Sequence, residues 1–309
     1  MKITKFDGNP ITAGGVFESV PIELYHSGHL CDAPSISSTG LRKIFSESEA
    51  HYFDESPYNP NRAEQGESEA LTLGRATHHL LLGESAFDKL FVVRPDKAPD
   101  GRAWHGSNAS CVKWNKDQRD SGKTILKGDL LERIKGMALA LGREPLVRAG
   151  ALNGLIECTM AVKDKETGVW LLSRPDVIPT DSGDFVDLKT TVSVKYNDLV
   201  RTLGDTGYNQ QGALVAECYR ALFGRKIASF SFYFVESKRP HCARMMQLKD
   251  EDLALGERQN RNALHRFVRA LNTGYWPGPG GNQESVQFIE MSDRARELVE
   301  DRLKYEGID

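Results

Sequence analysis

Residues 169–191 read VWLLSRPDVIPTDSGDFVDLKTT, and this stretch decides the fold that we expect. Residues 169–178 and 184–190 are rich in apolar and β-branched side chains, which favour strands. The polar residues 181–184 between them are typical of a turn. The stretch therefore predicts two neighbouring strands, and residues 155–163 predict a third strand just before them.

Three charged residues of the two strands indicate a metal-dependent active site. Side chains alternate along a strand, so Asp187 and Lys189 share one face of the second strand while Leu188 points to the opposite, apolar side. A tight hairpin would bring Asp176 of the first strand beside them. Two neighbouring carboxylates repel each other and favour a divalent cation between them, and oxygen ligands suit Mg²⁺ or Mn²⁺. A lysine beside such an ion can orient or deprotonate the attacking water.

The pattern acid-x-Lys is common by chance, and two interpretations stay open on spacing alone. Glu236-Ser237-Lys238 is a second triplet of this kind, at the end of another predicted strand and without a paired upstream acid. For Asp187-Leu188-Lys189 the other interpretation is a surface salt bridge on an edge strand. The spacing by itself does not separate a nuclease site from such a salt bridge.

Elements on both sides of this stretch predict a mixed central sheet flanked by helices, an α/β (α+β) fold. Apolar residues at helical spacing mark helices, and alternating or continuous apolar runs mark strands. The expected helices are 68–82, 127–141, 194–203, 208–223, 250–272 and 292–305, the expected further strands are 227–236 and 242–248, and residues 97–123 are expected to form an irregular, mobile excursion.

The chain of 309 residues is long enough for one large domain or two modest ones. We expect one domain over residues 1–309. It is expected to contain a helical N-terminal part at about 35–150, a catalytic sheet core at about 151–250 and C-terminal helices at about 250–309.

Composition is that of an ordinary globular protein, with 39% hydrophobic and 27% charged residues. No apolar run approaches the roughly 18–20 residues of a membrane span, and residues 1–7 lack the apolar stretch of a signal peptide. Five cysteines lie far apart without a CxxC pair, which argues against a zinc or iron–sulfur site and fits free thiols in a reducing cytoplasm. The net charge of −3 neither indicates nor excludes nucleic-acid binding, because acidic outer surfaces can offset a basic channel.

Arg174-Pro175-Asp176 followed by Asp187-Leu188-Lys189-Thr190-Thr191 resembles the PD-(D/E)xK nuclease signature. The version is that of the exodeoxyribonuclease VIII (RecE-type) exonucleases of phages and prophages. The resemblance runs from about Tyr25 to about Gly274 and includes several separate motifs. It implies a restriction-endonuclease-like core.

The same resemblance implies roles for the residues of the hairpin. Asp176 and Asp187 would hold one or two Mg²⁺ ions, which Mn²⁺ could replace, and the Leu188 carbonyl would also reach the metal. Lys189 would orient or deprotonate the water.

The predicted helix 68–82 carries the string from Gly74 to Leu82, GRATHHLLL. At 3.6 residues per turn, Gly74 lies one turn before His78 and leaves space beside the imidazole. A lone histidine here would more often be buried and bonded to backbone. The string is similar to the Gly-x-x-x-His-x-Leu-Leu-Leu motif of the RecE-type family, and this resemblance implies that His78, rather than His79, is a metal ligand.

The helix that begins Tyr208-Asn209-Gln210-Gln211 is similar to a further family motif, Tyr-x-x-Gln followed four residues later by Tyr. Val215 stands where the second tyrosine is expected, which puts the hydrogen-bonding role of this helix in doubt. A glutamine in an apolar stripe needs a partner, and a phosphate or a metal-bound water could provide one. We expect Gln211 to position the scissile phosphate, and Tyr208 to contact DNA or to belong to the core.

Further candidates surround these motifs. Glu157 could add a carboxylate to the metal cluster or be a charge at a strand edge. Residues 35–42 resemble the serine-rich helix start of the family, where Ser38 at a helix N-terminus and Arg42 could bind a 5′-phosphate, although simple helix capping explains the serines as well. Arg174, on the face of Asp176, is another candidate DNA contact.

The resemblance implies a magnesium-dependent exonuclease that degrades linear double-stranded DNA from 5′ to 3′ and leaves 3′ single-stranded tails for recombination. It also implies a ring-shaped homotetramer, and a single-strand annealing recombinase as partner in a bacterial or phage-infected cell. Two alternatives stay open. One is another nuclease on the same fold, an endonuclease or a Cas4-like enzyme, although the missing cysteine cluster counts against the latter. The other is a non-catalytic DNA-binding protein.

Overall fold

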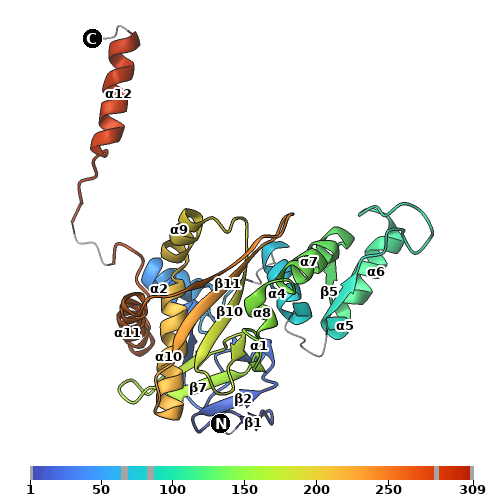
Figure 1. Ribbon diagram of the computed structural model, residues 1–309. Helices are drawn as coiled ribbons and strands as arrows, with labels where there is room; N and C mark the ends of the chain where they lie inside the picture. Colours follow the sequence, from blue (N-terminus) through green and yellow to red (C-terminus); the bar gives the residue numbers. More distant parts are fainter. Residues whose placement is uncertain (1–2, 64–68, 82–86, 282–284, 307–309) are drawn as a thin grey trace.

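The computed structural model describes residues 3–63, 69–81, 87–281 and 285–306. Two five-stranded sheets lie at the centre of the fold (Figure 1). The N-terminal sheet contains, in spatial order, β1 (Ile3–Lys5), β2 (Gly15–Glu18), β7 (Thr159–Lys163), β8 (Trp170–Ser173) and β3 (Ser35–Ser37). The other sheet, which we call the catalytic sheet because it carries Asp187 and Lys189 of the predicted site, contains, in spatial order, β12 (Ala243–Gln247), β11 (Ser229–Glu236), β10 (Asp184–Thr191), β9 (Val177–Ile178) and β6 (Leu155–Ile156).

The catalytic sheet is mixed, because β10 runs parallel to β11 whereas the other neighbours are antiparallel. Both of its faces are buried. Phe185 belongs to the core cluster on one face, while Val186 and Leu188 belong to the cluster on the other. The interpretation of residues 187–189 as an exposed edge-strand salt bridge is therefore wrong, since β10 is an interior strand.

Helices cover the two faces of this sheet, so the predicted fold class is confirmed. One face packs against α10 (Tyr208–Phe223), which α11 (Asp250–Thr273) and α2 (Ser38–Ser46) cover in turn. The other face packs against α4 (Glu69–Leu81) and α7 (Gly128–Leu141). The remaining helices are α1 (Ile22–Tyr25), α3 (Glu49–Glu55), α5 (Phe87–Leu90), α6 (Ala109–Asp120), α8 (Pro145–Arg148), α9 (Tyr196–Thr206) and α12 (Asp293–Glu306). The ends of the predicted helix 68–82 fall on residues 68 and 82, outside the described residues.

The strands predicted at 155–163 and 169–178 are each broken in two, because the chain changes sheets within them. Residues 157–158 connect β6 of the catalytic sheet to β7 of the N-terminal sheet, and residues 174–176 connect β8 back to β9. Glu157 adopts a left-handed backbone conformation with φ of 51°, which ends the first strand. The Glu157 amide donates a hydrogen bond to the Asp176 carbonyl at 3.1 Å, and this bond joins the two connections.

Two other predicted segments differ from the structure. Residues 97–123 contain α6, whose hydrophobic pattern is weak because only Cys111 is buried on it. Residues 35–37 form β3 beside β8 instead of a capping cluster, and Ser37 makes no side-chain cap to α2. Local β-pairing therefore overrides the capping preference of the serines.

All five cysteines are free thiols, and four of them are buried. Within the described ranges no helix combines the length and the hydropathy that a membrane span needs.

The first turn of α10 depends on a close approach by α11. A Cβ added at Gly256 of α11 would lie 2.4 Å from the Asn209 carbonyl oxygen. We expect Gly256→Ala to lower the free energy of unfolding by up to about 2 kcal/mol, since overpacking costs about 1–3 kcal/mol and the better helix propensity of alanine returns about 1 kcal/mol. Denaturant unfolding of the purified variant measures this change.

Gly204 of the exposed helix α9 is the matched control, because nothing lies within 4 Å of an added Cβ there. Gly204→Ala should raise the free energy of unfolding by up to about 1 kcal/mol. Equal effects of the two substitutions would contradict the close approach of α10 and α11.

Candidate active site

A polar cleft of about 240 Å³ opens beside the point where the chain crosses between the two sheets. It receives side chains from α1, α2, α10, β8 and β10 and from both sheet connections. The residues that line it are Ile22, Tyr25, His26, Ser37, Ser38, Thr39, Arg42, Glu157, Ser173, Arg174, Asp176, Lys189, Gln211 and Val215. Seven of the residues predicted for the site from the sequence are among them.

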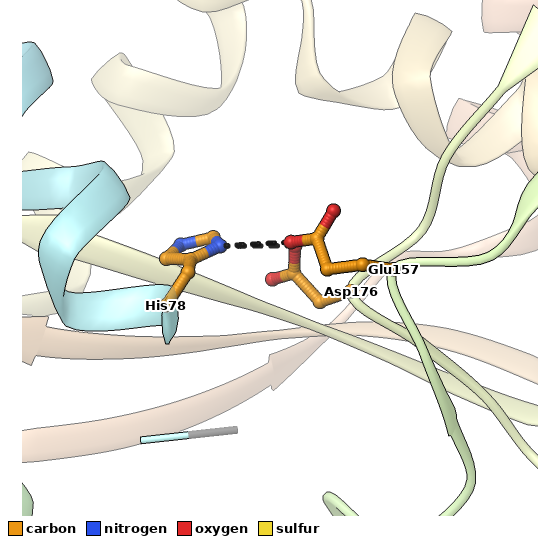
Figure 2. A group of neighbouring side chains, drawn as sticks. All are labelled: His78, Glu157 and Asp176. Atoms are coloured by element: carbon orange, nitrogen blue, oxygen red, sulfur yellow. Dashed lines mark ion pairs between the residues drawn. The ribbon is translucent and has the colours of Figure 1, made fainter. Parts of the chain in front are cut away.

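Three potential metal ligands lie together here, and two of them, Glu157 and Asp176, line the cleft. One ligand atom from each of His78, Glu157 and Asp176 lies within 4.8 Å of the others. Figure 2 shows the imidazole on its helix and the two carboxylates on the facing connections, with the three side chains pointing toward one another. His78 Nδ1 lies 3.1 Å from Asp176 Oδ1 and 3.7 Å from Glu157 Oε1.

This group attracts positive charge. Burial lowers the pKa of His78, but the charge and hydrogen bond of Asp176 outweigh it and raise the pKa to about 10. Burial raises the pKa of Asp176, but the charge of His78 outweighs this and holds it below the usual value. One imidazole nitrogen and several carboxylate oxygens form a donor set that fits Mg²⁺ or Mn²⁺.

Asp187 lies on the neighbouring strand with its own partners. Val177 pairs with Val186, and this register places Asp176 opposite Asp187. Gln211 donates from Nε2 to Asp187 Oδ1 at 2.8 Å, and Lys189 forms an ion pair with Asp187 Oδ2. The side chain of Asp187 is only 1% exposed, so both interactions are shielded from solvent.

Burial and the charge of Asp176 raise the pKa of Asp187 to about 6. Burial lowers the pKa of Lys189, but the charges of Asp187 and Asp176 outweigh this and hold it above its usual value. Lys189 therefore carries a full positive charge at neutral pH. The Leu188 amide donates to Asp176 Oδ2 at 2.5 Å and fixes that carboxylate against β10.

Tyr208 lies below the cleft and packs against Phe232, with 5.0 Å between the ring centroids. Its ring faces Lys189 Nζ at 5.2 Å and the Arg42 guanidinium at 5.9 Å. Such cation–π contacts orient both cations. Tyr208 thus contacts two cations of the site and the aromatic core, which agrees with both roles expected from the sequence.

Three hydrogen-bond donors of the cleft are buried and have no hydrogen-bond partner among the described residues: Ser38 Oγ, Arg42 Nε and Arg174 Nη1. Arg174 also uses Nε to bond the Glu157 carbonyl at 2.9 Å, and it forms an ion pair with the Glu157 carboxylate at 3.1 Å. Buried polar groups of this kind need an acceptor, and an anion in the cleft would supply one.

Sequence patterns leave two roles open for Glu157 and do not single out Tyr25 or His26. Glu157 was expected on a strand, whereas the left-handed turn that aims it at His78 has no clear sequence signal. Tyr25 lies under the Arg174 guanidinium at 5.8 Å, and its hydroxyl donates to the Leu172 carbonyl at 3.1 Å. Val215 is buried and lines the cleft where the expected tyrosine would have stood.

An α/β fold with a mixed sheet, on which Asp176, Asp187 and Lys189 meet, defines a protein of the PD-(D/E)xK class. The chain belongs to the family described as PDDEXK-like domain of unknown function (DUF3799), which matches residues 37–288. The family covers both sheets except β1, β2 and the first two residues of β3.

Solved structures agree with this fold. A “Putative exonuclease” from Eubacterium rectale is similar with a TM-score of 0.55 and 17% identity, over 85% of this chain and 92% of that one. A phage-related exonuclease from Haemophilus somnus has a TM-score of 0.34 and 10% identity, over 78% of this chain and 96% of that one. At this identity the first likeness shows the fold alone, and the second score is too low to add to it. No curated protein matches the chain.

The geometry of His78, Glu157 and Asp176 leads to a prediction about metal binding. Glu157→Gln and Asp176→Asn should each weaken the binding of Mn²⁺ by about tenfold or more, because each removes a charged oxygen ligand. Titration calorimetry with MnCl₂ on the full chain measures the affinity without any need for activity.

Asp184→Asn is the control, since this exposed carboxylate lies at the start of β10, outside the ligand group, and accepts from Ser229 Oγ at 2.7 Å. The Asp184→Asn variant should bind Mn²⁺ with the same affinity as the unmodified chain. Unchanged affinity in both Glu157→Gln and Asp176→Asn would contradict the metal site.

Proposed function

We propose that this protein is a divalent-metal-dependent exonuclease that degrades linear double-stranded DNA from 5′ to 3′. The observation that carries the proposal is the convergence of two groups at one cleft. Glu157 and Asp176, which lie beside His78, line this cleft together with Lys189 and Gln211, which both contact Asp187.

His78, Glu157, Asp176 and Asp187 would hold one or two Mg²⁺ ions, with the Leu188 carbonyl as an additional ligand. A bound ion of this kind supplies Lewis-acid polarisation of a phosphate and lowers the pKa of bound water. The donor set and the pull of the carboxylates on positive charge support this assignment.

Lys189 is the residue that faces the reacting phosphate in this proposal. Its raised pKa keeps the ammonium protonated, so it stabilises negative charge and orients the attacking water. Gln211 holds Asp187 through Nε2, and its Oε1 has no hydrogen-bond partner among the described residues. That free acceptor can position a water beside the phosphate.

The end of the DNA strand would enter the cleft beside Ser38, Arg42 and Arg174. Their unsatisfied donors support a pocket for a terminal 5′-phosphate, which an exonuclease needs and an endonuclease does not. The structurally similar protein from Eubacterium rectale is likewise named as an exonuclease, which supports this choice.

The remaining parts of the proposal rest on the resemblance to the RecE-type exonucleases. They are 3′ single-stranded tails for homologous recombination, a ring-shaped homotetramer, an annealing recombinase as partner, and action in the cytoplasm of a bacterial or phage-infected cell. A ring suits a chain with a net charge of −3, because only the lining of the channel needs to be basic.

A cleavage assay tests the proposal. The full chain is incubated with 5′-phosphorylated linear duplex, closed circular duplex and single strands, with Mg²⁺ or with EDTA. We expect degradation of the linear duplex from its 5′ ends, intact circles, and no activity in EDTA. Lys189→Ala should lower the rate by about 10²–10⁴-fold, the range for loss of a residue that positions or transfers a proton.

Lys238→Ala is the matched control, because Lys238 ends the second acid-x-Lys triplet and is exposed. That variant should keep full activity. Cleavage of circles would overturn the exonuclease assignment, and full activity in Lys189→Ala would overturn the assigned site. Thermal melting of Lys189→Ala checks that it is folded.

A further inference from the structure

Residues 87–127 form a lobe that projects beyond α4 and α7, away from both large sheets (Figure 1). We call these residues the basic lobe. It contains α5, α6 and a two-stranded parallel sheet of β4 (Phe91–Val93) and β5 (Thr124–Leu126).

The basic lobe carries a charge opposite to that of the rest of the chain. It holds nine lysine and arginine residues against five aspartates, a net charge of +4, whereas the whole chain carries −3. The other residues together therefore carry −7. A positive lobe on an acidic protein is the charge distribution expected of a surface that binds a polyanion.

The exposed face of α6 concentrates this charge. Val112, Lys116 and Arg119 follow one another at i, i+4 and i+7, so they form one stripe, and all three are exposed. Among the described residues no ion pair to Lys116 or Arg119 is present. The neighbouring Lys113 is neutralised, because its Nζ lies 2.7 Å from Asp117 Oδ2.

The stripe has no role in holding the lobe together. Cys111 and Trp114 lie on the opposite face of α6, where Trp114 packs edge-on against Trp104 with 5.3 Å between the ring centroids. The Arg94 guanidinium lies over the Trp104 ring, 5.5 Å from its centroid. Because this inner face supplies the packing, Lys116 and Arg119 remain available to a ligand.

The lobe is attached to the helix that carries His78. The ring of Phe91 in β4 lies 5.4 Å from the ring of His79 and 5.8 Å from the Arg75 guanidinium, both on α4. Phe91 is itself buried. A ligand held by the lobe is thereby held in fixed relation to α4.

We propose that the basic lobe binds the phosphate backbone of duplex DNA that the active site has not yet degraded, with Lys116 and Arg119 as contacts. This inference rests on the proposed function, which supplies DNA as the polyanion. Lysine and arginine contacts to phosphate are independent of sequence, as an enzyme that moves along DNA requires. The lobe acts on affinity and on the length degraded per encounter, and it leaves the chemical step unchanged.

The test measures binding in EDTA, where cleavage cannot occur. A short blunt-ended duplex is titrated with the full chain over a range of salt concentrations, and single strands of the same sequence are titrated in parallel. For Lys116→Ala/Arg119→Ala we expect weaker duplex binding, by about fivefold or more at low salt. The slope of log Kd against log salt should fall by roughly two, because each phosphate contact contributes about 0.9.

Lys249→Ala/Arg258→Ala, at the N-cap of α11 and on α11, removes the same charge from exposed positions away from the lobe and is the control. It should bind as the unmodified chain does. Unchanged Kd and slope in the lobe variant would overturn the inference, as would a loss confined to single strands or equal losses in both double variants. Thermal melting confirms that each variant is folded.

The two proposals fail separately in this design. If the unmodified chain cleaves linear DNA while the lobe variant binds duplex normally, only the role of the lobe is overturned. If the lobe variant loses duplex binding but no preparation cleaves DNA, only the nuclease proposal is overturned. With active enzyme at saturating DNA, the lobe variant should keep kcat and shorten the length degraded in each encounter.

Discussion

Four ionisable side chains lie together in one largely buried place, and each is paired with an opposite charge. They are His78, Asp176, Asp187 and Lys189. Isolated charges would not be stable there, because removal from water costs several kcal/mol per ion unless each is paired. The imidazole balances Asp176, and the ammonium balances Asp187. The Gln211 amide and the Leu188 amide satisfy further carboxylate oxygens. The packing of α4 and α10 on opposite faces of the sheet brings His78 and Gln211 to these carboxylates.

The centre of this arrangement could be predicted from the sequence. Alternation along two strands places Asp176, Asp187 and Lys189 together, and the observed pairing of Val177 with Val186 agrees with it. The hydrophobic patterns of α4, α7, α10 and α11 were equally clear, because each buries a continuous apolar face in a core. The roles of the individual site residues remain predictions.

The position of Glu157 and the division of the strands between two sheets could not be predicted from the sequence. A continuous apolar run has the same pattern whether it stays in one sheet or crosses to another. The breaks at residues 157–158 and 174–176 therefore have no signal in the hydrophobic pattern. The helix α6 was missed for a different reason. It buries little apolar surface, and its sequence is dominated by the exposed polar and charged side chains that also fill loops.

The two crossings between the sheets have a mechanical consequence. Glu157 and Asp176 sit at joints, and one backbone hydrogen bond links these joints. Both connections between the sheets run through these joints, so a change in the way the two sheets dock would also move the two carboxylates. Local opening in proteins proceeds through such cooperative units. The positions of the proposed metal ligands are thus tied to the docking of the two halves of the molecule.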